Sequence, residues 1–600
     1  MRFIEKTACI LLLVSTQPST FAQSPPATKH VTQQTSVERT RPENTILQKV
    51  TSVLERVIEA QKTFADENLR VMIRAHIADM LWAYDQPRAR RLFEVAIQAA
   101  DRLADQDTPP PQVGVSFFPV RTQVIRLILP HDPDWATKLI ESRGEIATDF
   151  QGQSIRRDRE RTNLQSHLVF YFAQRDVQRA VRAARPLAES GNSRALMQFL
   201  SFIRSKDVQA ADELYRLALA KARAGQSAFF DIVTFAYYVL PSFGEGVLRV
   251  SSDKNKRDPF ALSPSDAAAL EQFLEFAYEA ASRHLDSAAA GMSGVRLDPR
   301  SVFDFAIPKL LAPYFDRFIP ERAPAFRARL QEALQRVPAE QRQYLVLSDP
   351  GTVESWLSRA ETTTDPQLRD TLILRAVSRV SYGEFKRTSA LIEKMSDDRI
   401  RANARFTLHQ TQNAALVDDA WSALNQDDLD RAEALASEIS DWRSDGGLLL
   451  RSLVGRLSRK DKARATQVLN EYQQRAAGIT EPHERAMRLM HLAGVAATID
   501  SNRGFEEMTR AVSEFNRAGF VPELERYLDN KNASGPWSPQ VNIGLSSLLG
   551  NWDLFWLGST DMDRALGLAK TFQLKEAAAL MQLNVCRGVL RTLPAAARPR

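Results

Sequence analysis

The sequence predicts an all-α protein built as an irregular α-solenoid of antiparallel helical hairpins. Glycine is scarce, with 24 among 600 residues, whereas the helix-forming residues alanine, leucine, arginine, glutamate and glutamine are abundant. No run of alternating β-branched residues indicates a strand. Amphipathic stretches follow one another with short connections, as in 266–285, where large apolar residues gather towards one side of a helix. Helices are therefore expected along nearly all of the chain.

The N-terminal residues are expected to lie outside this helical array. Residues 1–22 have a charged start with Arg2 and Lys6, a short apolar core and small residues before a cut after Ala22, which is the layout of a cleaved signal peptide. Residues 23–44 contain few apolar side chains and predict a flexible linker. We therefore expect an exported protein, periplasmic or secreted, from a bacterial cell.

The composition argues against disulfide bonds, nucleic-acid binding and a membrane span. Once the signal is removed, Cys586 is the remaining cysteine, so an intramolecular disulfide is excluded and the core alone must hold the fold. A formal net charge of +6 is small for a chain of this length, and nucleic acid is not an expected partner. No segment after the signal is long and apolar enough to predict a membrane span.

A repeated dipeptide predicts where several helices begin. Serine or aspartate followed by proline offers an oxygen that caps the first turn and a preset φ that needs no amide partner. The five pairs are Asp132-Pro133, Ser263-Pro264, Asp298-Pro299, Asp365-Pro366 and Ser538-Pro539.

A second pattern predicts the second helix of each hairpin. In the stretch LWAYDQPRARRLFEVA, Asp85 is followed by Ala89, Phe93 and Ala96, which fall in one narrow helical stripe. The aspartate caps the helix, a small residue lets a neighbouring helix approach, and a larger residue fills the space beside it. Copies are Asp207 with Ala211, Tyr215 and Ala218, Asp428 with Ala432, Asp461 with Ala465, and Asp561 with Ala565; Asp176 with Ala180 also fits, and Glu384 with Thr388 is looser.

This spacing resembles the second helix of the tetratricopeptide repeat, in which small, aromatic and small residues recur at the same offsets. Ala89, Phe93 and Ala96 carry the resemblance most clearly. The first-helix Trp, Leu, Gly and Tyr positions of that family are not matched consistently, and the proline that closes each repeat is mostly absent. The resemblance implies TPR-like hairpins in an irregular array.

The sequence predicts two helical-repeat regions, 45–347 and 352–600, with the boundary at the sequence SDPGT. Two segments interrupt the helical pattern, 106–120 and 241–264, and both contain glycine and proline. Long connections of this kind are either functional or disordered, and the sequence leaves both alternatives open.

No motif predicts a catalytic residue, a cofactor or a metal site. The chain contains no HExxH, CxxC, GxSxG or GxxxxGK[ST] pattern, and no GxGxxG follows a strand. Glu189-Ser190 and the following Ala195-Leu196-Met197-Gln198 are similar to two elements of soluble lytic transglycosylases. Only GNSR separates the two elements, which favours a loop and the next amphipathic helix.

Two further clusters are interpreted as structural. The basic run 155–161 is interspersed with acidic residues, which is typical of a solvated helix face. Four aromatic residues near the C-terminus are expected to bury the last core layer of the array; they are Trp537, Trp552, Phe555 and Trp556.

These observations lead to two hypotheses about function. The first is a non-enzymatic scaffold outside the cytoplasm, whose helical array binds a protein or a peptide. The alternative is a cell-wall or polysaccharide-acting enzyme with a carboxylate site inside a helical ring, because such carboxylate pairs are defined by distance in space and are not visible as a motif.

Overall fold

The computed structural model describes most of the chain between residues 42 and 593, and all regular structure in that part is helical, which confirms the all-α fold class. The described ranges are 42–105, 120–142, 151–190, 193–224, 228–240, 267–291, 303–337, 352–377, 379–380, 384–440, 445–518 and 554–593. The predicted signal, nearly all of the linker, the first predicted long connection except Val120, the whole of the second and the SDPGT boundary except Thr352 lie outside these ranges, as do the starts at Ser263, Asp298 and Ser538.

Where the connection between two helices is described, it is in most cases a short turn. The first part contains α1 (Pro42–Gln61), α2 (Glu67–Leu81), α3 (Gln86–Asp105), α4 (Val120–Ile128), α5 (Pro133–Glu141), α6 (Gln151–Ala173), α7 (Val177–Glu189), α8 (Ser193–Arg204), α9 (Val208–Arg223), α10 (Ala228–Val239), α12 (Ala267–Gly291), α13 (Phe303–Phe318) and α14 (Ala323–Arg336). The second part contains α15 (Val353–Thr362), α16 (Pro366–Val377), α17 (Phe385–Ile392), α18 (Asp398–Asn425), α19 (Leu429–Glu438), α20 (Asp445–Lys460), α21 (Lys462–Ala477), α22 (Pro482–Ala496), α23 (Ser501–Ala518), α25 (Phe555–Thr560), α26 (Met562–Ala569) and α27 (Lys575–Thr592).

Six pairs of these helices pack as hairpins whose second helix begins at a capping aspartate. Each aspartate accepts a hydrogen bond from the backbone N–H three residues on, at 2.9 to 3.1 Å, and the alanine four residues on is fully buried. These pairs are Asp85 with Ala89, Asp176 with Ala180, Asp207 with Ala211, Asp428 with Ala432, Asp461 with Ala465, and Asp561 with Ala565. Glu384 differs, because its side chain makes no capping hydrogen bond although Thr388 is buried.

The starts of several first helices share a device that the sequence analysis did not identify. An apolar residue, any residue and then Asp or Glu recur in FADENLR (64–70), MSDDRIR (395–401) and ITEPHER (479–485). The acidic side chain caps the helix, as Asp66 does for the N–H of Leu69 at 3.2 Å. The arginine six residues after the apolar residue donates to its carbonyl oxygen in two copies, Arg70 at 3.1 Å and Arg485 at 2.9 Å.

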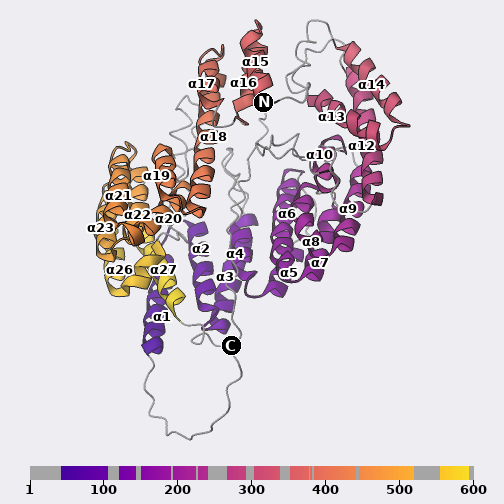
Figure 1. Cartoon of the computed structure of the whole chain (residues 1–600). Coiled ribbons are helices and arrows are strands. Elements are labelled where there is room, and N and C mark those ends of the chain that lie inside the picture. The colour runs from indigo at the N-terminus through magenta and orange to yellow at the C-terminus, as the bar shows by residue number, and fades with distance from the viewer. Residues whose placement is uncertain are drawn as a thin grey trace, which may run out of the picture.

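The first and last described helices together form one further hairpin. Helix α1 immediately precedes a first-helix start at 64–70, so α1 occupies the place of a second helix. Its first-helix partner is α27, the last described helix, which packs along it. Figure 1 shows the yellow α27 beside the indigo α1. We call α27 with α1 the composite hairpin.

Buried side chains show how the array continues through this hairpin. One core cluster joins α1–α3 to α22–α27, and we call it the closing cluster. The other clusters run through α2–α14, through α15–α18 and through α18–α22. Packing is therefore continuous from α15 through the composite hairpin to α14, while no core cluster of the described residues spans α14 and α15. The first and last described helices therefore meet inside the stack, and the described stack ends at α14 and α15, in the middle of the sequence.

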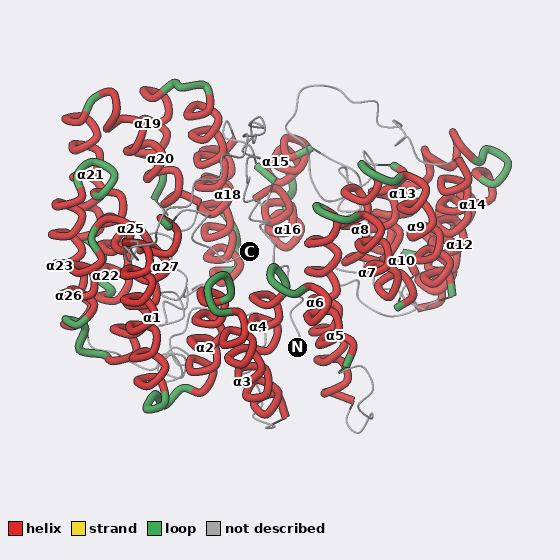
Figure 2. The backbone as a smooth tube through the Cα atoms, turned by 90° about the horizontal axis from the view of Figure 1, so that it is seen from below, coloured by secondary structure: helices red, strands yellow, loops and turns green. Residues whose placement is uncertain are grey.

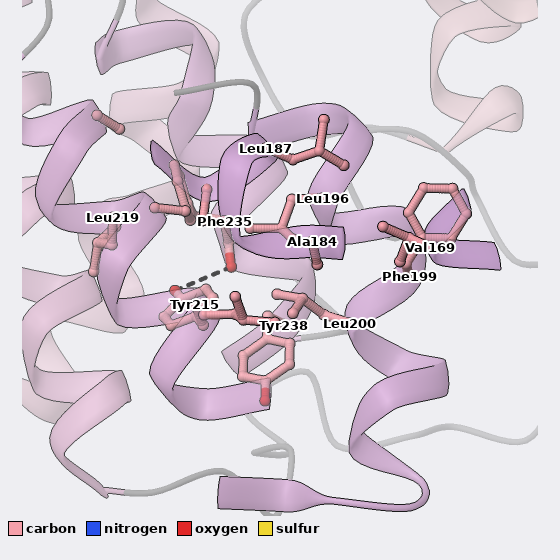
Figure 3. Packing of buried hydrophobic residues seen from close by; sticks show 14 of the residues in the cluster. Val169, Ala184, Leu187, Leu196, Phe199, Leu200, Tyr215, Leu219, Phe235 and Tyr238 are labelled. Atoms are coloured by element: carbon pink, nitrogen blue, oxygen red, sulfur yellow. Dashed lines mark hydrogen bonds between the residues drawn. The ribbon is translucent and has the colours of Figure 1, made fainter. Parts of the chain in front are cut away.

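Figure 2 shows two arms of the array, one formed by α18–α23 and the other by α5–α14. In the arm formed by α18–α23, the second helices α21 and α23 lie along the outer edge, and α20 and α22 lie nearer the middle of the molecule (Figure 2). In the arm formed by α5–α14, the core is rich in aromatic rings, and the Tyr215 hydroxyl donates to the Phe235 carbonyl oxygen at 3.2 Å (Figure 3). Among the described helices, none has the length and hydropathy needed to cross a membrane.

Candidate functional site

The aromatic and basic stretch around Asp85 is a structural joint. The Trp82 ring stacks on His131 with centroids 5.2 Å apart and lies 5.9 Å from the Phe93 ring, which is fully buried. Arg88 pairs with Glu55 at 3.1 Å, and Arg90 pairs with Asp132 at 3.1 Å. Ala96, Tyr215 and Ala218 are also fully buried, so the recurring stripe residues face the core. The stretch is occupied by contacts within the chain.

A second group of polar residues ties the C-terminal helix to α2. Arg587 of α27 donates to Asp79 at 3.2 Å and lies 2.7 Å from His76 Nδ1, while His131 Nε2 lies 2.8 Å from Asp79. Burial, together with the Arg587 charge, lowers the pKa of His76 to about 3. Burial alone would raise the pKa of Asp79, but the His131 hydrogen bond and the Arg587 charge lower it overall. This network ties α27 to α2 and to the turn after α4, beside the composite hairpin.

A serine just after α19 and a histidine in α18 have a catalytic spacing but the wrong hydrogen-bond direction. Ser440 Oγ lies 2.7 Å from His409 Nε2. Asn413 Oδ1 accepts both the N–H and the O–H of Ser440, so its amide nitrogen faces His409 Nδ1 at 3.2 Å. His409 Nδ1 must then accept and Nε2–H must donate to the serine, so the imidazole is not placed to remove the serine proton. Asp370 holds Ser396 in the same way between α16 and α18, which indicates a structural role.

A pocket of about 460 Å³ lies where α18, α20 and the turn after α22 meet. We call it the Trp421 pocket. Its lining residues are Trp421, Arg451, Ser452, Gly455, Arg456, Ser458, Arg459 and Thr498. Arg451, Gly455 and Arg459 recur at every fourth position of α20, which places them on one face of that helix. The lining therefore combines one aromatic ring with three guanidinium groups and no carboxylate.

Contacts behind the pocket hold its wall in place. Arg456 donates to the carbonyl oxygen of Leu424 in the last turn of α18, and Ser458 Oγ donates to the Thr498 carbonyl oxygen at 3.4 Å. Lys460 pairs with Asp427 at 2.6 Å, and Asp427 has a φ of 60° in the turn between α18 and α19. Residues of three hairpins thus contribute to one wall. Its lining residues span 77 positions of the sequence, from Trp421 to Thr498.

Gly455 leaves an opening in this wall that core packing does not require. A Cβ atom added at Gly455 would meet no atom within 4 Å. A glycine inside a helix costs about 1 kcal/mol relative to alanine. By contrast, a Cβ at Gly588 would lie 1.9 Å from the Phe555 carbonyl oxygen, so that glycine is required by the close crossing of α25 and α27. Gly455 therefore lowers helix stability while keeping the space between Arg451 and Arg459 open.

The remaining sequence interpretations fall into place around these features. Glu189 is the last residue of α7, and Ser190 caps its end while Leu196 is buried in α8, so this segment is a helix end and the next helix. Phe555 and Trp556 are buried, and Trp556 belongs to the closing cluster, which joins α1–α3 to α22–α27, and not to a last layer of the array. Trp537, Trp552 and the side chains of 155–160 lie outside what the structure describes.

None of the residues that the sequence singled out lines the Trp421 pocket. The signal that could have found it is the stretch RSLVGRLSR (451–459), in which Arg, Gly and Arg recur at helical spacing. The described residues contain no group of three His, Cys, Asp or Glu side chains placed to hold a metal ion. The chain matches no protein-family model, and no curated protein matches it significantly.

Proposed function

We propose that the protein is an exported scaffold that binds a protein or peptide on the face formed by α18, α20 and α22. The observation that carries the proposal is the Trp421 pocket, because it joins an aromatic ring, arginines and an open glycine on helices that already pack against their neighbours. Aromatic residues and arginine are enriched at protein interfaces and dominate their binding energy. The N-terminal sequence supports export, and a solenoid offers an extended surface for such a partner.

The enzyme alternative has no such observation in its favour. Hydrolysis of a polysaccharide needs two carboxyl groups facing one cleft, about 5–10 Å apart. The Trp421 pocket has no carboxylate in its lining. The pocket is therefore suited to binding and lacks an acid or a base for glycoside cleavage.

A test that does not depend on ligand charge is to fill the pocket. Gly455→Leu places a side chain where no atom lies within 4 Å of the added Cβ, so the fold is expected to tolerate it. The tagged full-length protein, Gly455→Leu and the control Gly567→Leu, at another uncrowded helix glycine, are cross-linked in cells and purified from each cell fraction.

We expect the protein in the envelope or secreted fraction, with a cross-linked partner that Gly455→Leu loses and Gly567→Leu retains. Protein found only in the cytoplasm, or a partner retained equally by both variants, would contradict the proposal.

A further inference from the structure

We propose that the Trp421 pocket binds an acidic segment of the partner, with a carboxylate between Arg451 and Arg459 and an adjacent apolar side chain against Trp421. This inference rests on the proposed function and specifies the chemistry of the partner. It follows from three properties of the pocket, namely its charge, its shape and its surroundings.

The charge of the lining selects an anion. Three of the eight lining residues are arginines. Guanidinium groups bind carboxylates through two parallel N–H···O bonds, which are stronger and more directional than neutral hydrogen bonds. Arg456 donates to the Leu424 carbonyl oxygen and fixes the wall. Arg451 and Arg459 stand on the same stripe of α20, two turns apart, on either side of Gly455. Each guanidinium carries five N–H donors, so each can take a carboxylate in addition to contacts within the chain.

The shape of the pocket admits a carboxylate between these two arginines. Gly455 lies one helical turn from each of them, and no side chain fills the space above it. Ser452 and Ser458 add hydroxyl groups to the lining. An acidic side chain entering over Gly455 can reach both guanidinium groups, whereas any larger residue at position 455 would occupy its path.

The size and the aromatic wall of the pocket favour a peptide over a small ion. A volume of about 460 Å³ lies within the range of sites that hold drug-sized ligands and exceeds what one carboxylate or phosphate needs. Trp421 provides apolar area with a polar N–H tip, which suits a neighbouring apolar side chain. One acidic and one apolar residue in sequence would satisfy both parts of the pocket.

The surroundings disfavour a polyanion such as a nucleic acid. Asp427 lies beside the pocket, 4.0 Å from Arg456 and 2.6 Å from Lys460. Its interaction with Lys460 lowers the pKa of this carboxyl, which keeps it ionised. A chain of phosphates that continued past the three arginines would meet this negative charge. A peptide with a single carboxylate at the pocket avoids that repulsion.

The experiment uses the full-length protein and a fluorescein-labelled peptide in which glutamate alternates with leucine and serine, followed by fluorescence anisotropy. A matched peptide has glutamine at each glutamate position. Inorganic phosphate and a thymidine oligonucleotide serve as competitors. The protein variants are Arg451→Gln, Arg459→Gln and Gly455→Leu, with Arg91→Gln on α3 as the control.

We expect the glutamate peptide to bind at least about tenfold more tightly than the glutamine peptide, because losing a charge-assisted hydrogen bond removes on the order of 1.5–3 kcal/mol. Each pocket variant is expected to lose about as much affinity, while Arg91→Gln binds unchanged. Thermal melting of each variant shows whether the fold is retained.

Three results would overturn the inference. They are equal binding of the two peptides, unchanged binding by folded pocket variants, or displacement of the peptide by the oligonucleotide or by phosphate at lower concentration than by unlabelled peptide. Any of them would still leave the proposed function open, because the Gly455→Leu cross-linking test does not depend on the charge of the partner.

Discussion

Two hairpins of this protein solve the same packing problem with different chain connectivity. In α22/α23 a short turn at 497–500 joins the helices, and a Cβ at Gly504 would lie 2.7 Å from the Ala497 Cβ, which shows how closely they approach. In the composite hairpin, α27 and α1 are the last and first described helices, and all the other described helices lie between them in the sequence. The comparison shows that the packing unit is the pair of helices and not the continuous segment.

The difference is energetic. A short turn keeps two helices close even when their contacts loosen, whereas the ends of a long chain separate with a gain of entropy that grows with loop length. In addition to its apolar core, the composite hairpin is held by polar contacts between α27 and the residues that follow α1, which are the α1–α2 turn, α2 and the α2–α3 turn. Lys575 donates to the Thr63 carbonyl oxygen at 2.7 Å, Tyr84 donates to that of Leu590 at 3.4 Å, and Arg587 pairs with Asp79. We therefore expect this hairpin to open before the continuous ones.

The largest expected effect concerns the reactivity of Cys586 in α27. This thiol is fully buried, and burial raises its pKa to about 12, so it reacts only when the hairpin opens. Deleting 42–61 is expected to raise the rate of alkylation by orders of magnitude. A matched reporter is Val454→Cys in a Cys586→Ser background, placed in the continuous hairpin α20/α21. Slower alkylation of Cys586 than of this reporter in the intact chain would contradict the comparison.

The next effect concerns the helix crossing within the closing cluster. Gly588→Ala places a Cβ 1.9 Å from the Phe555 carbonyl oxygen, so α25 and α27 must separate. We expect a loss of unfolding free energy at or above the ~1–3 kcal/mol typical of overpacking. The control is Gly567→Ala in α26, where nothing lies within 4 Å and alanine is expected to stabilise the helix by up to about 1 kcal/mol. Chemical denaturation measures both, and similar midpoints would show that the crossing is not tight.

Phe93 in the continuous hairpin α2/α3 gives the corresponding core measurement. Its ring is fully buried between Trp82 and Trp135, so Phe93→Ala is expected to cost about 3–5 kcal/mol. Arg91→Ala, on the exposed side of the same helix, is expected to change stability by less than about 0.5 kcal/mol. The reverse order in thermal melting would show that the helical stripe is wrongly assigned.

The smallest effect is the pH dependence of stability that comes from His76, which contacts Arg587 of α27. Burial lowers the pKa of His76 from 6.5 to about 3, so below pH 6.5 the unfolded chain binds a proton that the folded chain does not. Stability should therefore fall by of order 1–2 kcal/mol between pH 7 and pH 5. His167 in α6 also has its pKa lowered by burial, to about 4, and provides the matched comparison.

His76→Gln and His167→Gln should each reduce the acid sensitivity of global unfolding. Only His76→Gln should reduce the acid sensitivity of Cys586 alkylation, because His76 contacts Arg587 in the same helix as the thiol. If both variants changed the acid sensitivity of alkylation equally, the contact between His76 and Arg587 would not control the opening of the composite hairpin.

Local patterns of the sequence predicted the helices and several of their boundaries. Asp461 caps the N–H of Arg464 at 2.9 Å, and Asp132 and Asp365 cap the helices whose prolines follow them. These interactions span three or four residues, so spacing along the chain is enough to recognise them. The FADENLR-type starts are equally local, but they contain neither the Ser/Asp-Pro pair nor the Asp-Ala stripe by which the other starts are recognised.

The pocket could not be predicted in the same way. Trp421 belongs to α18, the arginines to α20 and Thr498 to the turn after α22, and no single stretch contains more than a part of the lining. Arg451 and Arg459 alone are indistinguishable from a solvated basic face. What distinguishes them is the ring of Trp421 and the unfilled space at Gly455, both of which depend on how the three helices pack.

By itself, the sequence determined that this chain forms helices and that several of them begin at capping aspartates, because capping and helical periodicity are interactions between near neighbours. Only the tertiary structure decided that α27 and α1 complete one hairpin and that the stack is continuous through the first and last described helices. The physical reason is that the free energy of apolar burial depends on the area buried and not on chain connectivity. A helix about 500 residues away therefore covers an apolar stripe as well as an adjacent helix does.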